Sequence, residues 1–228
     1  GGYIRLSEED GKNESVSVGN QRKIISQFAD ENNLVNDEIM CLLKDSSGLI
    51  WIGTYSGVST FNPNNSFIHL KSGPEDNGIS DNVIHGIYED NDNILWIGTN
   101  ESGVNIINKE NLKNLNKENV KSLNEENSNL ISNSIEDITG FGDKIFIGTN
   151  DGLSVLSKQD KTADSYTITN YTEDNGLPSN KIRSLFVDSK GYLWIGTREG
   201  VAILDTNNKE IIDITRKYPK IKLHVDMV

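Results

Sequence analysis

The stretch Leu49-Ile50-Trp51-Ile52-Gly53-Thr54 returns three times along the chain. Its counterparts are Ile94-Leu95-Trp96-Ile97-Gly98-Thr99, Lys144-Ile145-Phe146-Ile147-Gly148-Thr149 and Tyr192-Leu193-Trp194-Ile195-Gly196-Thr197. The central aromatic residues are separated by 45, 50 and 48 residues. A period of about 40–50 residues is typical of propellers and of helical solenoids.

The local pattern within each repeat favours the propeller. Short runs of β-branched and aromatic residues are separated by Gly, Asn and Asp, which is typical of strands and turns. The first run of each repeat covers Ile39–Lys44, Ile84–Glu89, Ile135–Gly140 or Ile182–Val187. The Trp-Ile-Gly-Thr run is second, and the third is Gly57–Asn62, Gly103–Asn108, Gly152–Ser157 or Gly200–Asp205. A more variable fourth run covers Ser66–Lys71, Val120–Asn124, Tyr166–Tyr171 or Ile211–Arg216. Four antiparallel strands per repeat form a propeller blade, so we predict an all-β fold, a β-propeller.

The repeats divide the chain into one propeller domain with an incomplete fifth unit. We predict four full blades over about 34–78, 79–129, 130–176 and 177–217. Residues 1–33 predict a partial blade, and 218–228 predict the start of a further strand. Neither end has a Trp-Ile-Gly-Thr strand, so we expect a fragment of a larger propeller, because an exposed edge strand invites pairing. The alternative is that the two ends complete one blade together. Lys109–Asn129 predicts a polar insertion, with a short helix as the alternative.

Composition excludes several classes of protein. The 228 residues contain 22 Lys and Arg against 34 Asp and Glu, which gives a formal net charge of −12. Without clustered basic residues the chain is a poor binder of nucleic acid, which we exclude as a partner. No apolar run approaches the ~20 residues of a membrane-spanning helix, so we expect no direct membrane insertion of this segment. The single cysteine, Cys41, excludes an internal disulfide and is interpreted as a packed small residue.

Catalytic and metal-binding patterns are absent from the sequence. The histidines, His69, His85 and His224, lie far apart and show no metal-ligand spacing, so we interpret them as structural or solvated. The run Asp90-Asn91-Asp92-Asn93 lacks the sixth-position Gly and the later Glu of a calcium loop, and is interpreted as a hairpin turn. No phosphate-binding loop or nucleophile elbow is present. We therefore predict no catalytic residue, no metal and no cofactor.

The repeat resembles that of a known family. Gly176-Leu177-Pro178-Ser179-Asn180-Lys181-Ile182, then Asp188-Ser189-Lys190-Gly191-Tyr192-Leu193-Trp194-Ile195-Gly196-Thr197 and Gly200-Val201, resembles the two-component regulator propeller repeat. The resemblance recurs four times and is weakest near Phe146, where the turn shortens to Phe141-Gly142-Asp143. It implies the extracytoplasmic sensor region, periplasmic or cell-surface, of a membrane-anchored bacterial histidine kinase or related receptor. The output kinase or cyclase is not within these residues. The family often senses carbohydrates or their breakdown products.

Two sets of polar loops are expected to surround one mouth of the propeller. They are the loops that lead into each first strand and the loops between the second and third strands. The recurrent lead-in position reads Asp37, Asn82, Asn133 and Asn180, which we interpret mainly as turn residues. Amides, carboxylates, an Arg and a Tyr can bind hydroxyls, anionic groups and sugar faces. The candidate ligand-binding residues are Tyr55, Asn100, Glu101, Asp151, Arg198 and Glu199, followed by Asn82 and Asn180.

Three functions remain open at this stage. The first is a sensor propeller that binds a small polar ligand, such as an oligosaccharide, and signals to a cytoplasmic output domain. The second is a protein-interaction or dimerisation platform of such a receptor, with a homodimer as the partner; exposed aromatic residues away from the mouth would favour it. The third is a lyase-type propeller enzyme, which needs a His and acid set, often with a metal. His85 would lie near the axis, but no second His accompanies it.

Overall fold

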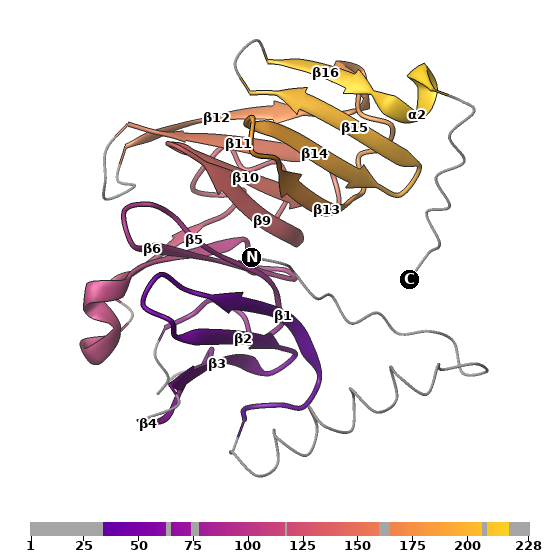
Figure 1. Cartoon of the computed structure of the whole chain (residues 1–228). Coiled ribbons are helices and arrows are strands. Elements are labelled where there is room, and N and C mark those ends of the chain that lie inside the picture. Colours follow the sequence, from indigo (N-terminus) through magenta and orange to yellow (C-terminus); the bar gives the residue numbers. More distant parts are fainter. Residues whose placement is uncertain are drawn as a thin grey trace, which may run out of the picture.

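Four four-stranded antiparallel sheets make up the described part of the chain. The computed structural model describes residues 34–62, 65–73, 78–116, 118–159, 165–206 and 209–218. Within them the sheets follow one another in chain order as a fan (Figure 1). The first two are β1 (Ile39–Lys44), β2 (Ile50–Thr54), β3 (Gly57–Asn62) and β4 (Asn65–Leu70), then β5 (Ile84–Glu89), β6 (Ile94–Thr99), β7 (Val104–Asn108) and β8 (Val120–Leu123). The last two are β9 (Ile135–Phe141), β10 (Lys144–Thr149), β11 (Leu153–Lys158) and β12 (Tyr166–Tyr171), then β13 (Ile182–Val187), β14 (Tyr192–Thr197), β15 (Gly200–Asp205) and β16 (Glu210–Asp213).

These sheets are the blades of a propeller, which confirms the predicted fold class. In every sheet the strand order is the chain order, so the first strand and the fourth strand are the two edges. The first strands of neighbouring blades contact each other, β1 with β5, β5 with β9 and β9 with β13. They are therefore the innermost strands of the fan. The partial blade predicted over 1–33, and all but Tyr218 of the strand predicted over 218–228, lie outside the described residues.

Two local predictions need correction or completion. The fourth strand predicted over Ile211–Arg216 ends early, because β16 stops at Asp213 and the short helix α2 (Ile214–Lys217) follows. Asp213 caps this helix, since its Oδ1 accepts a hydrogen bond from the Arg216 amide at 2.8 Å. In the polar insertion, the alternative of a short helix holds for its first part, where the 3₁₀ helix η1 (Lys109–Asn114) follows β7.

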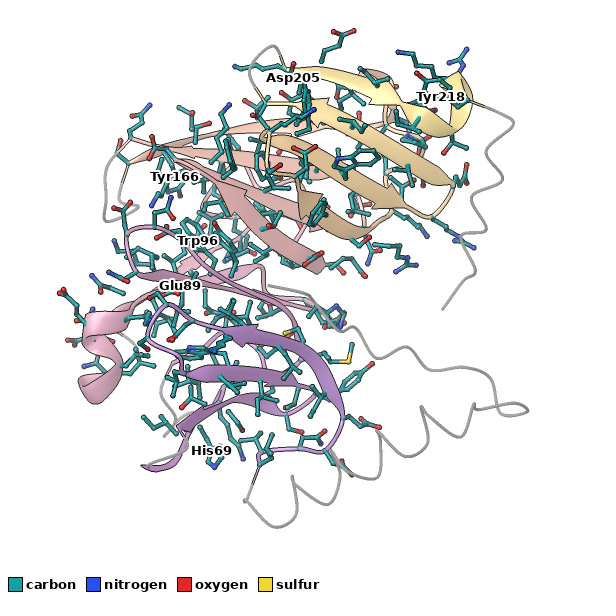
Figure 2. The ribbon with its side chains drawn as sticks, viewed as in Figure 1. His69, Glu89, Trp96, Tyr166, Asp205 and Tyr218 are labelled. Atoms are coloured by element: carbon teal, nitrogen blue, oxygen red, sulfur yellow. The ribbon has the colours of Figure 1, made fainter. Side chains whose placement is uncertain are left out.

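The aromatic residue of each repeat fills the space between two blades. Trp51, Trp96 and Phe146 are each 0% exposed. Each packs with apolar residues of the next blade; Trp96, for example, shares a cluster with Ile135, Ile138, Ile145 and Ile147. Figure 2 shows Trp96 between the second and third sheets. Because an aromatic side chain buries a large apolar area, this position supplies much of the attraction between blades.

A glycine two residues after the aromatic position allows the blades to approach closely. A Cβ atom at Gly53, Gly98 or Gly148 would come within 2.8, 2.5 or 2.6 Å of the Cγ2 of the isoleucine that opens the next blade. The three isoleucines are Ile84, Ile135 and Ile182, and each is 0% exposed. Each interface between blades is therefore closed by a glycine on one side and a β-branched residue on the other.

An aspartate in the turn between the first two strands holds the tryptophan of its own blade. The Nε1–H groups of Trp51, Trp96 and Trp194 donate to Oδ2 of Asp45, Asp90 and Asp188 at 3.0, 3.0 and 3.3 Å. The Oδ1 of the same aspartates accepts two backbone N–H groups of the turn, such as Asp92 and Ile94 for Asp90. The third blade has Phe146, which has no ring donor, and a turn that lacks this aspartate. Tryptophan and aspartate therefore occur as a pair.

A lysine from the next blade completes this arrangement at two interfaces. Lys109, which follows β7, places its Nζ 2.7 Å from Asp45 and 2.6 Å from Glu89. Lys158, at the end of β11, places its Nζ 2.6 Å from Asp90 and 2.8 Å from Asp92. Burial alone would raise the pKa of Asp45, but hydrogen bonds from Lys109, Ser47, Trp51 and Leu49 outweigh it and lower the pKa from 3.8 to about 2.

The fourth blade differs because its outer aromatic face is open. Trp194 is 38% exposed, Tyr192 is 38% exposed and Phe186 is 59% exposed. Phe186 pairs with Trp194 across β13 and β14, so both side chains lie on the face that the first three blades bury against a neighbour. None of the described residues covers this face as the next blade covers Trp51 or Trp96.

Candidate functional site

The candidate site lies at the end of the blades where the second and third strands are joined. The threonine of each Trp-Ile-Gly-Thr or Phe-Ile-Gly-Thr run shapes this loop. The Oγ1–H of Thr54, Thr99, Thr149 and Thr197 donates to the carbonyl oxygen of the glycine that opens the third run, at 2.8 Å in each blade. These threonines are at most 1% exposed. The same hydrogen bond thus closes this loop in every blade, although the loop of the second blade, 100–102, is one residue longer than the others.

These loops lie against the lead-in loops, so both polar sets share one end of the propeller. The amides of Tyr55, Asn100, Asn150 and Arg198 donate to the carbonyls of Glu38, Val83, Ser134 and Lys181, which stand just before the first strands. Gly57 also donates to the Asn82 carbonyl at 2.7 Å, and Gly103 to that of Asn133 at 2.9 Å. The latter two bonds cross from one blade to the next. They place the loops of adjacent blades side by side; we call this end the mouth.

A β-bulge at the start of each innermost strand brings a further residue to the mouth. The register skips one residue in each pairing, between Ile39 and Cys41, Ile84 and Gly86, Ile135 and Asp137, and Ile182 and Ser184. The skipped residues, which we call the bulge ring, are Met40, His85, Glu136 and Arg183. Bulges redirect side chains and occur often beside functional sites. The ring therefore presents four different chemistries at equivalent positions.

Glu136 and Arg183 connect the third and fourth blades within this ring. The Arg183 Nη1 lies 3.2 Å from the Glu136 Oε2, and the Asn150 Nδ2 donates to Glu136 Oε1 at 3.0 Å. The Glu136 side chain is 6% exposed, whereas that of Arg183 is 47% exposed. The carboxylate is thus buried and fixed by two partners. The guanidinium reaches outward, where its planar fork can bind a polar ligand.

The predicted binding residues of the loops lie at the mouth but do not contact one another through hydrogen bonds. Tyr55 is 45% exposed, Glu101, Asp151, Arg198 and Glu199 are exposed, and Asn100 is half-buried. Among the described residues, no hydrogen bond or ion pair joins these six side chains to each other. They form an open polar rim around the bulge ring.

Asn82 and Asn180 are engaged by their own loops. The Asn82 Oδ1 accepts the Ser72 amide at 2.8 Å, and its Nδ2 donates to the Ser72 carbonyl. The Asn180 Oδ1 accepts the Glu173 amide at 2.8 Å, while Glu173 Oε1 accepts the Asn180 amide at 2.9 Å. The equivalent Asn133 exchanges the same pair of bonds with Glu125. The recurrent asparagine thus stabilises the lead-in loop, and its side-chain oxygen already accepts a hydrogen bond from a backbone amide.

The other candidates for chemistry have structural partners. The Nδ1 of His69 lies 3.0 Å from Ser59 Oγ, and that of His85 lies 3.1 Å from the Ile135 carbonyl oxygen. His224 lies outside the described residues. In the described ranges, no three His, Cys, Asp or Glu side chains gather to hold a metal ion. None of the helices in those ranges has the length and apolarity needed to cross a membrane.

The residues missed by sequence reasoning are Glu136, Arg183 and Met40. A usable signal existed in the sequence. Each first strand begins with Ile, then a variable residue, then a small one: Ile39-Met40-Cys41, Ile84-His85-Gly86, Ile135-Glu136-Asp137 and Ile182-Arg183-Ser184. A position that varies between two repeated ones marks a side chain that the fold itself does not require.

The geometry defines a propeller whose blades carry different polar side chains on one repeated frame. A family model described as two component regulator propeller matches residues 33–56, 78–101 and 176–199. These segments run from the lead-in loop to the mouth loop of the first, second and fourth blades. Three of the four blades therefore carry a segment that matches this repeat family, as the sequence resemblance implied. The unmatched blade is the one with Phe146 and the shortened turn.

Three comparisons extend this result. The chain is 29% identical over 204 residues to histidine kinase P4 of Formosa agariphila, an alignment that covers 82% of this chain and 14% of the kinase. It is similar to the extracellular domain assigned to a hybrid two-component system of B. thetaiotaomicron, with a TM-score of 0.65, 22% identity and coverage of 78% and 24% of the two chains. It is also similar to the extracellular domain assigned to a one-component system of that organism. The TM-score is 0.65 and the identity 19%, and the alignment covers 79% of this chain and 25% of the other. The chain thus spans a minor part of each relative.

Proposed function

We propose that this propeller is the extracytoplasmic ligand-sensing domain of a membrane-anchored bacterial receptor of the two-component sensor kinase type. It binds a small polar ligand, such as a carbohydrate, at the mouth and passes the signal to a cytoplasmic output domain. Support for the receptor class comes from the repeat family and from the histidine kinase relative. The extracellular neighbours support the proposed location.

The observation that carries the proposal is the contrast between a repeated frame and non-repeated side chains at the mouth. The threonine caps and the loop-to-strand bonds recur in every blade. The bulge ring instead reads Met, His, Glu and Arg, and the loop tips carry Tyr, Asn, Asp and Arg. Folding requires the recurrent threonine caps and loop-to-strand hydrogen bonds, but it does not require different side chains at the mouth of each blade. Such diversity suits the recognition of one asymmetric ligand.

The chemistry of the mouth fits a polyhydroxylated ligand. Arg183 and Arg198 offer forked donors, Asp151 and Glu101 offer acceptors, and Tyr55 offers an exposed ring for an apolar sugar face. A nucleophile with an adjacent base is not part of this set. We therefore propose a binding domain in preference to an enzyme.

A thermal-shift screen of the chain against soluble oligosaccharides, uronic acids, amino acids and small peptides tests the proposal. A ligand present at 100 times its dissociation constant stabilises the folded state by ~2.7 kcal/mol. For a chain of this size that raises Tm by roughly 5–10 °C. The shift should fall in Arg198→Ala, Tyr55→Ala and Arg183→Gln, and persist in Lys190→Gln, which removes an exposed cation at the opposite end. No shift with any compound class, on a chain that melts cooperatively, would count against the proposal.

The open face of the fourth blade favours the interaction platform as a second candidate function. Phe186, Tyr192 and Trp194 are exposed aromatic residues away from the mouth. In the first three blades the same face is buried by a neighbouring sheet, so the occupant that fits is another such sheet, from a second copy of this chain. Sedimentation of the chain and of Trp194→Ser tests this. A concentration-dependent dimer that the substitution dissolves would support it, and a monomer at all concentrations would exclude it.

A further inference from the structure

The interface between the third and fourth blades lacks the carboxylates that the two preceding interfaces share. There, an aspartate of one blade meets a lysine of the next, Asp45 with Lys109 and Asp90 with Lys158. In the third blade the tryptophan is replaced by Phe146, and the turn has no counterpart of Asp45 and Asp90, since its one aspartate, Asp143, is exposed. In the fourth blade the position equivalent to Lys109 and Lys158, six residues after the glycine of the third run, is Thr206. Both partners of the ion pair are therefore absent.

A small cavity opens at this interface. Its volume is about 50 Å³. Two cross-strand rows of the third blade form its floor: Lys144, Ser157 and Thr167 pair in one row, and Phe146, Val155 and Thr169 in the next. The remaining wall is formed by Tyr171 of the third blade and by Leu204, Thr206 and Lys209 of the fourth. Since about 10–15 Å³ of such space holds one water, the cavity has room for a carboxylate or a phosphate group.

The cavity is lined by two cations and by hydroxyl groups. Lys144 comes from β10, and its Nζ donates to the carbonyl oxygen of Thr206, which fixes the ammonium group at the cavity wall. Lys209 directly precedes β16, the fourth strand of the next blade. No ion pair involves either lysine within the described ranges. Ser157, Thr167, Thr169 and Tyr171 add hydroxyl donors.

Among the residues that the structure describes, no acidic side chain lines the cavity. Asp205 and Glu210 are neighbours in sequence of Thr206 and Lys209, and they pair with each other across β15 and β16. Since successive strand residues point to opposite faces, Asp205 lies on the face away from Leu204 and the cavity. In a chain with 34 acidic and 22 basic residues, a pocket whose described lining has two lysines and no carboxylate is unusual.

We propose that this pocket binds a small oxyanion, either a free phosphate-type ion or the carboxylate of a larger molecule. The anion would take the place that a protein carboxylate holds between the other blades. Two ammonium groups would neutralise it, and the threonine and serine hydroxyls would donate to its remaining lone pairs. The first residue of β10 is at the pocket and its last residue, Thr149, is at the mouth. The pocket is thus a site at the opposite end from the mouth.

Nuclear magnetic resonance titration of the ¹⁵N-labelled chain tests the proposal. Sodium phosphate and sodium acetate are the two probes, each at constant ionic strength maintained with sodium chloride. The expected result is a saturable shift of the Thr167, Thr169 and Thr206 amides with at least one probe, and none with chloride alone. Saturation by phosphate only indicates a free-ion site, and saturation by acetate indicates a carboxylate site. Shifts that stay linear with both probes would overturn the proposal.

Matched variants assign the effect to the pocket. Lys209→Gln should weaken binding by about tenfold or more, because a charge-assisted hydrogen bond contributes about 1.5–3 kcal/mol. Lys144→Gln should do the same, and Thr167→Val provides a milder change that keeps the shape of the side chain. Lys190→Gln, on the exposed turn of the fourth blade, is the control and should bind as the unaltered chain does. Equal affinity in Lys209→Gln and Lys190→Gln would refute the assignment, whatever the mouth binds.

Discussion

The Lys158 ammonium group lies 2.6 Å from the Asp90 carboxylate, although the two residues are 68 positions apart and belong to different blades. Their side chains are 2% and 1% exposed. The same carboxylate also accepts the indole N–H of Trp96 and two backbone amides of its turn. The pair is therefore fully hydrogen-bonded, which is the condition under which a buried ion pair is tolerated.

Removing the lysine should strongly destabilise the second interface. In Lys158→Met, Asp90 and Asp92 keep their charges but lose their counter-ion. We expect the free energy of unfolding to fall by about 3–5 kcal/mol, the usual cost of breaking a buried pair from one side. Urea denaturation at neutral pH measures this. Lys190→Met, an exposed lysine, should change the value by less than about 0.5 kcal/mol. If Lys158→Met lowered the free energy of unfolding only slightly, water would be hydrating the two carboxylates in place of the lysine.

Acid should weaken the first interface through Asp45. Its pKa is about 2 in the folded chain and has an ordinary value of 3.8. A carboxyl whose pKa is lowered on folding stabilises the protein above the unfolded pKa, and this contribution is lost as the pH falls toward the folded pKa. We expect a loss of about 2 kcal/mol between pH 5 and pH 2. Urea unfolding of Asp45→Asn should show a smaller fall over that range; an equal fall would assign the effect to other groups.

The three tryptophans should differ in their accessibility to a quencher. Trp51 and Trp96 are each 0% exposed, whereas Trp194 is 38% exposed. Acrylamide should therefore quench one fraction of the fluorescence readily and leave a protected, blue-shifted remainder. Trp194→Phe should remove the accessible fraction, and Trp96→Phe should remove part of the protected one. Uniform protection of all three would mean that the open face is covered in solution.

A single methyl group at a blade interface should be costly. In Gly98→Ala the new Cβ would lie 2.5 Å from Ile135 Cγ2 and 2.9 Å from Ile138 Cδ1, both in the next blade. Relief requires the blades to separate slightly, so we expect about 1–3 kcal/mol of lost stability. Thermal or urea denaturation checks this. Ser189→Ala, in an exposed turn, provides the comparison and should be close to neutral. Stability equal to that of the unaltered chain would show that the interface yields freely.

Most of the strand pattern could be predicted from sequence because the repeat itself is local. The runs Ile39–Lys44 and Tyr166–Tyr171 coincide with β1 and β12. The predicted end of the last strand, at Arg216, was wrong. Asp213 starts a helix where the apolar residues Ile211, Ile212 and Ile214 suggested a continuing strand. A capping side chain overrides such a pattern.

The site was less accessible to sequence reasoning. The loop residues could be identified from turn chemistry, and they remain predictions as ligand contacts. The Glu136–Arg183 pair joins residues 47 positions apart, and the bulge that presents them depends on a register that no single run reveals. The contacts of Lys109 and Lys158 were missed for the same reason. In the sequence, a lysine at the end of a strand cannot be distinguished from a solvent-exposed lysine, because its partner lies in another blade.

The uneven distribution of Trp, Asp and Lys has a consequence for how such a propeller can be rearranged. The blades look like interchangeable modules, yet these ion pairs join only the first blade to the second and the second to the third. If the third blade followed a copy of itself, Lys158 would face a turn that has no counterpart of Asp90 and would lose its buried carboxylate partner. The order of the repeats is therefore encoded in side chains that a repeat alignment does not compare. A duplicated or transposed blade would need substitutions of its charged interface residues before it could pack stably against its new neighbour.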